Sequence, residues 1–270
     1  MTPAWPVTEL HAALGALVAG MTVEWVPEID STNTELMRRA RAGDAAPVLL
    51  VAERQTAGRG RLGRPWQSAS DAGPGTLDES LTFSLGLPLA PADWSGLSLA
   101  VGASVADSLD PEGAQIRLKW PNDLWTAQDR KLGGILIETA MPHGGEAQRF
   151  VVIGIGLNIG PRPAEGLNTA PAWLREFRAD ATAPQALAAI AAPLVRDVLR
   201  FAAQGFAPFT QAFAARDALH GRELSLSDGT IGACEGVGAG GELLVRTSAG
   251  LQSITSSEVS VRPKAGEVRG

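Results

Sequence analysis

The stretch IRLKWPNDLWTAQDRKLGGILIETAMPHGGEAQRFVVIGIGLNI, residues 116–159, decides the fold class. Its first five residues alternate in character, with Ile116, Leu118 and Trp120 apolar and the two residues between them basic. Such a period of two predicts a strand with Arg117 and Lys119 on its other face. Two longer apolar runs follow at 132–139 and 150–159, and the turn-rich MPHGGE between them predicts an antiparallel hairpin.

Helix and strand patterns alternate on both sides of this stretch. We expect strands at 23–29, 48–53 and 81–87, and helices at 7–20, 34–41, 94–109, 184–203 and around 207–218. Residues 67–79 are small and polar and predict a mobile loop. From 221 to 263 the chain changes to short strand-like pieces separated by Asp-Gly and Gly-Gly turns, which predicts a small β-barrel or sandwich. The sequence therefore predicts an α+β fold followed by a small β module.

Composition excludes several classes of protein. With 45% hydrophobic and 19% charged residues among 270, the chain can bury a sizeable core. A net charge of −6 argues against nucleic-acid binding, which needs a broad basic surface. The single cysteine, Cys234, permits no internal disulfide, and the three histidines are too far apart for a zinc site. No apolar run approaches the roughly 20 residues that span a bilayer, so we expect a cytoplasmic protein.

The stretch AERQTAGRGRLGRPW, residues 52–66, combines glycines and arginines. Gly58, Gly60 and Gly63 satisfy G-x-G-x-x-G, but no helix follows to hold a pyrophosphate, so we reject a Rossmann site. Glycines let backbone N–H groups approach an anion, and arginines add permanently cationic donors. We interpret this loop, through Arg59, Arg61 and Arg64, as one that grips phosphate and carboxylate groups. The alternative is a surface turn with solvated arginines.

KWPNDLW, residues 119–125, and Lys131 form the second candidate region. Pro-Asn-Asp is ordinary turn chemistry, which explains Asn122 and Asp123 without any function. Asp123 equally suits a Mg²⁺ ion that accompanies ATP phosphates. Lys131 precedes two glycines at the start of an apolar strand. It is either an edge lysine or a point charge for the carboxylate of a substrate.

Two further segments have both structural and functional interpretations. In DSTNTE, residues 30–35, Thr32 and Glu35 fit a capping box for the following helix. A hydroxyl and an amide at a helix start also suit hydrogen bonds to a polar heterocycle. GIGLN, residues 154–158, ends a strand and indicates nothing by itself.

Taken together and in this order, these segments resemble the biotin–protein ligase family. The matching motifs are Ser31-Thr32-Asn33, Gln55-Thr56-Ala57-Gly58-Arg59-Gly60-Arg61, Lys119-Trp120-Pro121-Asn122-Asp123, Lys131-Leu132-Gly133-Gly134-Ile135-Leu136 and Gly154-Ile155-Gly156-Leu157-Asn158. The resemblance implies a mixed or antiparallel sheet with flanking helices, similar to class II aminoacyl-tRNA synthetases and biotin ligases. It also implies a catalytic domain over 1–218 and an SH3-like domain over 219–270.

The resemblance also implies a reaction in two steps. The carboxylate of biotin attacks the α-phosphate of ATP to give biotinyl-5′-AMP, and a lysine of a carrier protein then attacks this mixed anhydride. The family's catalytic residues correspond here to Lys131, Arg59 and Arg61. Its biotin-binding residues correspond to Ser31, Thr32, Asn33, Gln55, Arg59, Gly60, Arg61 and Lys131. The residues on the ATP and Mg²⁺ side correspond to Lys119, Asp123, Asn158, Arg61 and Trp66, with Asp123 as the candidate Mg²⁺ ligand.

The expected partner is the biotin carrier domain of acetyl-CoA carboxylase or a related carboxylase. Family members that also repress transcription carry an N-terminal helix-turn-helix domain, and only about two dozen residues precede the first expected strand here. We therefore expect no DNA binding and no membrane association, in a monomer or a homodimer. The alternatives are a lipoate–protein ligase or octanoyl transferase, which share the fold, and a catalytically silent protein that binds biotin or a nucleotide.

Overall fold

A seven-stranded mixed sheet forms the main body of the computed structural model, which describes residues 5–66, 79–141, 148–167, 169–255 and 261–263. The strand order is β1-β2-β3-β7-β6-β5-β4, with β1 parallel to β2 and every other neighbouring pair antiparallel. The strands are β1 (Thr22–Ile29), β2 (Val48–Gln55), β3 (Ser80–Leu89), β4 (Ile116–Lys119), β5 (Asp123–Thr126), β6 (Lys131–Ala140) and β7 (Arg149–Asn158). The expected hairpin is confirmed, since β6 and β7 pair over most of their length.

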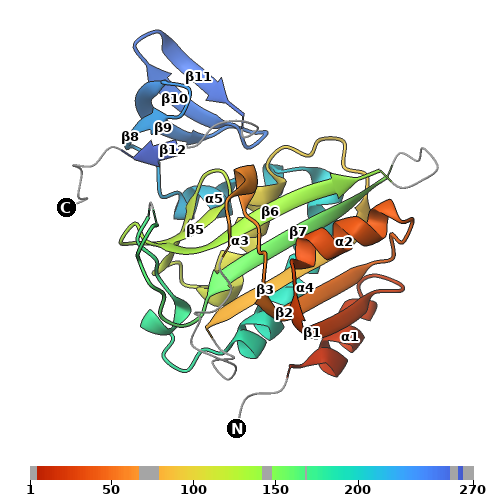
Figure 1. The fold of residues 1–270 in the computed structure, drawn as a ribbon. Helices are drawn as coiled ribbons and strands as arrows, with labels where there is room; N and C mark the ends of the chain where they lie inside the picture. Colours follow the sequence, from red (N-terminus) through yellow and green to blue (C-terminus); the bar gives the residue numbers. More distant parts are fainter. Residues whose placement is uncertain (1–4, 67–78, 142–147, 168, 256–260, 264–270) are drawn as a thin grey trace.

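Helices cover both faces of this sheet, as Figure 1 shows. They are α1 (Val7–Gly15), α2 (Thr32–Arg41), α3 (Leu97–Leu109), α4 (Ala183–Gln204) and α5 (Thr210–Arg216), with 3₁₀ turns at Arg61–Gly63, Leu174–Glu176 and Ala207–Phe209. Strand β2 is buried on both sides. Val48 and Leu50 pack with α2, whereas Leu49 and Val51 belong to the larger core with α3 and α4. This alternation follows from the period of two in a strand.

Several helix starts and ends differ from the expected ones. Helix α1 ends at Gly15 rather than at Gly20, because the chain turns after Leu14, whose carbonyl accepts from Leu17 N–H (3.0 Å) and Val18 N–H (2.9 Å). Helix α3 begins after Gly96, which has a left-handed φ of 80°. The expected capping box at Thr32 is wrong.

Ser31 is the residue that caps α2. Its hydroxyl accepts a hydrogen bond from Thr34 N–H (3.4 Å). The helix therefore starts one residue earlier than the capping-box pattern suggested, and Thr32 lies inside its first turn. The hydroxyl of Thr32 is thus available for contacts outside the helix.

The C-terminal segment forms a second, five-stranded antiparallel sheet in the order β11-β10-β9-β8-β12, as expected of an SH3-like module. Its strands are β8 (Glu223–Leu226), β9 (Ile231–Val237), β10 (Leu243–Thr247), β11 (Gly250–Ile254) and β12 (Val261–Pro263). Its apolar residues continue the main core, and Trp120 Nε1 donates to Gly241 O (3.0 Å). The expected boundary after residue 218 falls between α5 and β8.

The loop expected at 67–79 and the MPHGGE turn lie, except for their residues 79 and 141, outside the described residues. No helix among the described residues has the length and apolar character needed to cross a membrane.

Candidate functional site

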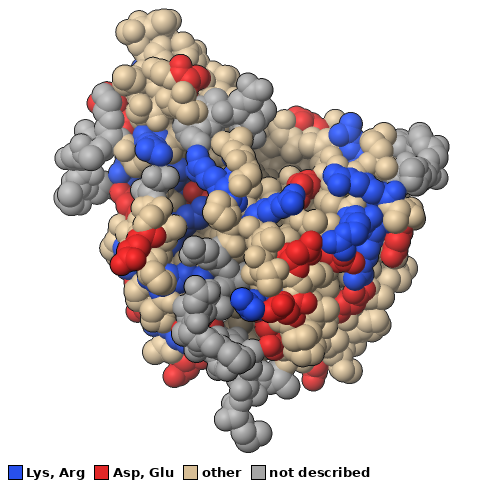
Figure 2. Space-filling view, in the orientation of Figure 1, with Lys and Arg blue, Asp and Glu red and all other residues tan. Residues whose placement is uncertain are grey.

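A cavity of about 1240 Å³ opens on one face of the seven-stranded sheet, beside the C-terminal module. Figure 2 shows Lys and Arg side chains gathered on this face, between the two sheets. All the site residues expected from the sequence line this one cavity. They are Ser31, Thr32, Asn33, Gln55, Arg59, Gly60, Arg61, Trp66, Lys119, Asp123, Lys131 and Asn158.

One end of the cavity is a buried cluster of neutral polar groups. The N–H and the hydroxyl of Thr32 both lie within hydrogen-bond distance of Gln55 Oε1, at 2.7 and 3.1 Å. The Ser84 hydroxyl is 2.7 Å from Thr32 Oγ1. Ser31 and Thr32 are both buried at the start of α2. This end suits a ligand group that is polar but uncharged.

Asn33 uses both ends of its amide for contacts within the protein. Its Oδ1 accepts from the Ser84 hydroxyl (2.6 Å), and its Nδ2 donates to Leu136 O (3.3 Å) and Glu138 Oε2 (3.0 Å). A Cβ at Gly154 would lie 2.1 Å from Asn33 Oδ1, so only glycine fits there. Asn33 therefore ties the start of α2 to β6 in addition to lining the cavity.

The Gly-Arg loop forms a small hairpin-like turn over the middle of the cavity. Gly60 N–H donates to Arg64 O (2.7 Å), and Trp66 N–H donates to Gly58 O (2.9 Å). Arg61 reaches Asn122 Oδ1 (3.3 Å), and burial lowers the pKa of its guanidinium. Arg59 lies exposed at the mouth.

The indole of Trp66 packs on the backbone of β7. A Cβ at Gly156 would lie 2.4 Å from Trp66 Cε2, so a side chain at residue 156 would displace the ring. Gly156, the second glycine of the GIGLN segment that indicated nothing by itself, thus allows Trp66 and its loop to pack on the sheet.

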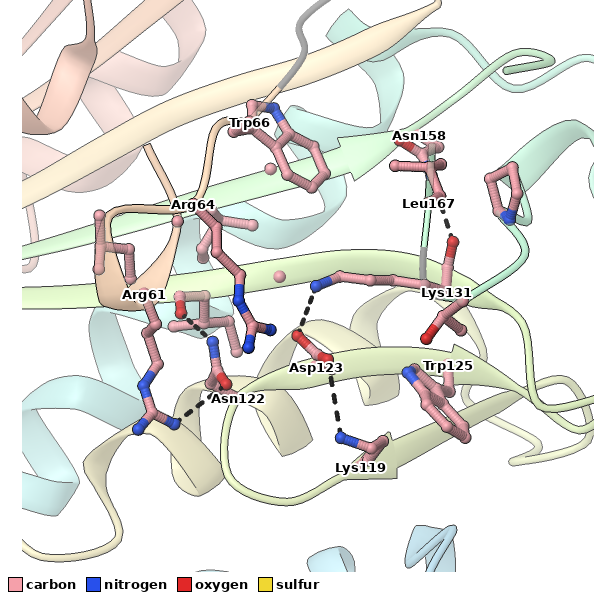
Figure 3. A pocket seen from close by; sticks show the side chains of 18 of the residues that line it. Arg61, Arg64, Trp66, Lys119, Asn122, Asp123, Trp125, Lys131, Asn158 and Leu167 are labelled. Carbon is pink, nitrogen blue, oxygen red and sulfur yellow. Dashed lines mark hydrogen bonds and ion pairs between the residues drawn. The ribbon is translucent and has the colours of Figure 1, made fainter. Parts of the chain in front are cut away.

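The other end of the cavity is charged. Asp123 lies between two lysines, as Figure 3 shows, with Lys131 Nζ 2.7 Å from Oδ1 and Lys119 Nζ 4.0 Å from Oδ2. Lys119 Nζ also lies 5.2 Å from the centroid of the Trp125 ring. Burial lowers the pKa of Lys119 to about 8, and the nearby cations act in the same direction, whereas Asp123 opposes the shift. This end suits an anionic ligand group.

Asn158 connects the charged end to the segment that follows β7. Its Nδ2 donates to Lys131 O (3.2 Å) and to Ala172 O (2.9 Å). Backbone hydrogen bonds from Lys131 N–H to Ala170 O and from Ala172 N–H to Lys131 O, both 2.8 Å, extend the connection. Residues 170–172 are thereby held against the backbone of Lys131, where Ala170 and Pro171 line the cavity.

The donor set at Asp123 does not suit a Mg²⁺ ion held by the protein. At nucleotide sites Mg²⁺ is usually held by one or two carboxylates together with substrate phosphates and waters, so Asp123 would need an oxygen free to bind it. The described residues hold no group of three or more His, Cys, Asp or Glu side chains that would bind a metal. The carboxylate of Asp123 already faces two ammonium groups, which would repel a divalent cation.

Several residues in or behind the cavity were missed by the sequence analysis. Ser84, which supports Thr32 and Asn33 from behind the cavity wall, had a signal, because a serine inside an apolar strand points to a polar partner. Trp125 lies inside a quoted motif but was not singled out. Arg162, whose pKa burial lowers to about 10, gave no local signal, and neither did the residues near the C-terminal module: Asp217, Ala218, Arg222, Val261, Arg262 and Pro263.

Comparisons with known proteins agree with this geometry. Residues 25–158 match the model of the biotin/lipoate A/B protein ligase family. The chain is 35% identical over 270 residues to the bifunctional ligase/repressor BirA of Escherichia coli K12, covering 95% of this chain and 79% of that protein. It is 32% identical over 241 residues to the biotin–[acetyl-CoA-carboxylase] ligase of Paracoccus denitrificans, covering 85% of this chain and 96% of that protein.

Among solved structures, the chain is similar to a biotin protein ligase from Aquifex aeolicus in complex with biotin and ATP. The TM-score is 0.73 at 27% identity, and the match covers 92% of this chain and 100% of that one. The likeness thus extends over both sheets.

Proposed function

The chain belongs to the biotin/lipoate A/B protein ligase family, and we propose that it is a biotin–protein ligase, which joins biotin to ATP and then to a carrier lysine. One observation carries the proposal: a single cavity joins a neutral polar end at Thr32 and Gln55 to a cationic end at Lys131 and Lys119. Biotin combines the same two kinds of group, since it has a neutral ureido ring at one end and a carboxylate at the other.

In the first step, a carboxylate oxygen of biotin bonds to the α-phosphorus of ATP and pyrophosphate leaves. Both reactants are anions, so positioning and positive charge contribute more than acid–base chemistry. We propose that Lys131 binds the carboxylate and stabilises the developing charge on the α-phosphate. Arg59 and Arg61 belong to the loop that covers the adenylate. Lys119 faces the nucleotide. No step is assigned to a Mg²⁺ ion held by Asp123.

In the second step, the amine of the carrier lysine attacks the acyl carbon of biotinyl-5′-AMP. The bond from that carbon to the phosphate oxygen breaks, AMP leaves, and the amine loses a proton. The loop of residues 58–66 would exclude water from the anhydride until the carrier arrives. We place the reaction in the cytoplasm and take the carrier to be the biotin domain of acetyl-CoA carboxylase or a related carboxylase.

We further propose that residues 1–218 supply the reacting groups and that the SH3-like module, 219–270, completes the wall of the cavity. Arg222 supports this arrangement, because its guanidinium pairs with Asp129 (2.8 Å) and both residues line the cavity. The proposal requires no second protomer, since all the assigned side chains come from one chain.

The test is adenylate formation without a carrier. The purified protein is incubated with ATP labelled in the α-phosphate, Mg²⁺ and biotin, and the nucleotides are separated. Lipoate and octanoate replace biotin in parallel reactions. A biotin-dependent adenylate supports the proposal, whereas a lipoate- or octanoate-dependent one assigns the protein to the lipoate branch. Folded protein that binds biotin without forming adenylate would be a silent binding protein.

A further inference from the structure

Asp123 is the carboxylate that contacts Lys131 in the cavity. It is the first residue of β5, where it pairs with Lys119 of β4 and with Gly134 of β6. Its side chain is 18% exposed, and Lys131 and Lys119 approach its two oxygens at 2.7 and 4.0 Å. Residue 134 lies directly against this contact, since a Cβ built on Gly134 would be in van der Waals contact with both Asp123 Oδ1 and Lys131 Nζ, at 3.6 Å.

These contacts are those of a counter-ion and not of a metal ligand. A Mg²⁺ ion on Oδ1 would have to displace the ammonium of Lys131, and it would still face Lys119 across the same carboxylate. Lys131 is 35% exposed and lines the cavity, so an incoming anion can reach its ammonium from there. The described residues contain no cluster of further acidic or histidine ligands that would complete a metal site.

We propose that Asp123 is the resident counter-ion of Lys131, which holds the ammonium in place and releases it to the carboxylate of the incoming acid. This inference rests on the proposed function, in which Lys131 binds that carboxylate. Asp123 acts through Lys131 and is therefore a positioning residue.

The proposal makes Asp123 a competitor of the substrate. Its negative charge pairs with Lys131 and also repels a second carboxylate beside it. Replacement by asparagine keeps the shape and removes the charge. We therefore expect Asp123→Asn to bind biotin about fivefold more tightly, the size expected for one partly exposed ion pair. Biotinamide, which has no charge, should bind both proteins with the same affinity.

The experiment is calorimetric titration of biotin and biotinamide, in the absence of ATP and Mg²⁺. It compares the wild type with Asp123→Asn and with Glu235→Gln, which makes the same chemical change at an exposed ion pair with Arg246 in the C-terminal module. Circular dichroism checks the fold, and Asp123→Ser serves as a second variant. In a Lys131→Met background the gain from Asp123→Asn should disappear, because no ammonium remains to be released.

A second measurement separates the counter-ion from a metal ligand. Adenylate formation is followed as Mg²⁺ is varied, and the half-saturating Mg²⁺ concentration of Asp123→Asn should stay within about twofold of the wild-type value. A rise of tenfold or more, with unchanged biotin affinity, would make Asp123 a metal ligand and overturn the proposal. Unchanged or weaker biotin binding in Asp123→Asn would overturn it as well. Wild-type protein that binds no biotin would overturn the proposed function together with it.

Discussion

Replacement of Lys131 by methionine tests the most important charge in the proposed site. Lys131 Nζ is 2.7 Å from Asp123 Oδ1 and faces the cavity. Methionine has a similar length and lacks the charge. A hydrogen bond to a charged group contributes about 1.5–3 kcal/mol, and Lys119 and Arg61 remain nearby to compensate in part. We therefore expect a loss of about 2 kcal/mol, or about 30-fold in kcat/KM for biotin.

The assay measures adenylate formation at saturating ATP over a range of biotin concentrations. Arg246→Met is the matched control, because it also removes a paired cation, in the C-terminal sheet and outside the residues that line the cavity. Its kcat/KM should equal that of the wild type. If Lys131→Met kept kcat/KM within twofold of the wild-type value, the role assigned to Lys131 would be refuted.

Three other perturbations probe the remaining parts of the site. Burial lowers the pKa of Lys119 from 10.5 to about 8, so kcat/KM for ATP should fall as the pH rises through about 8, and Lys119→Arg should abolish that fall. The unfolded chain keeps this proton up to about pH 10.5. Between pH 8 and 10.5 Lys119 therefore makes the free energy of unfolding rise with pH. A pH-independent rate would show that Lys119 does not face the nucleotide. Gly156→Ala should displace the indole of Trp66, which its Cβ would approach to 2.4 Å, and weaken biotin binding measured by tryptophan fluorescence; unchanged affinity would contradict this. Thr32→Val should lower the free energy of unfolding by about 1–3 kcal/mol in urea titrations, because the buried hydroxyl loses its partners; a loss below about 0.5 kcal/mol would count against the cluster.

Local sequence pattern predicted every strand of the main sheet except β5, which follows directly on the Pro-Asn-Asp turn and is only four residues long. The others were predictable because burial on one or both faces determines the order of apolar and polar residues in a strand. The alternation at Ile116–Lys119 and the apolar runs of β6 and β7 are examples. Helix ends were less predictable, since they depend on single hydrogen bonds. Both Ser31 and Thr32 suited a cap by composition, and only the backbone path shows that Ser31 is the cap and that Thr32 turns to Gln55.

The site was predictable where its residues lie in compact motifs. The parts of the site where distant segments meet were not predictable, because no short sequence pattern indicates which segments will become neighbours. Arg222 and Asp129 are 93 positions apart and become neighbours only when the C-terminal module packs beside the sheet. The pairing of Asp123 with two lysines could not be predicted for a related reason. The sequence of a turn motif is the same whether its aspartate binds a metal, pairs with a lysine or only stabilises the turn.

The most direct test of the central claim, an acyl-adenylate made in this cavity, is to follow the carboxylate oxygens of biotin. Biotin labelled with ¹⁸O in both carboxylate positions is incubated with ATP, the enzyme and a carrier domain, and the AMP and phosphate products are analysed by mass spectrometry. We expect one ¹⁸O atom in each AMP, because the oxygen that attacks the α-phosphorus leaves with it. ADP formed in place of AMP, with the ¹⁸O found in inorganic phosphate, would mean that the acid attacks the γ-phosphate and would contradict an acyl-adenylate mechanism.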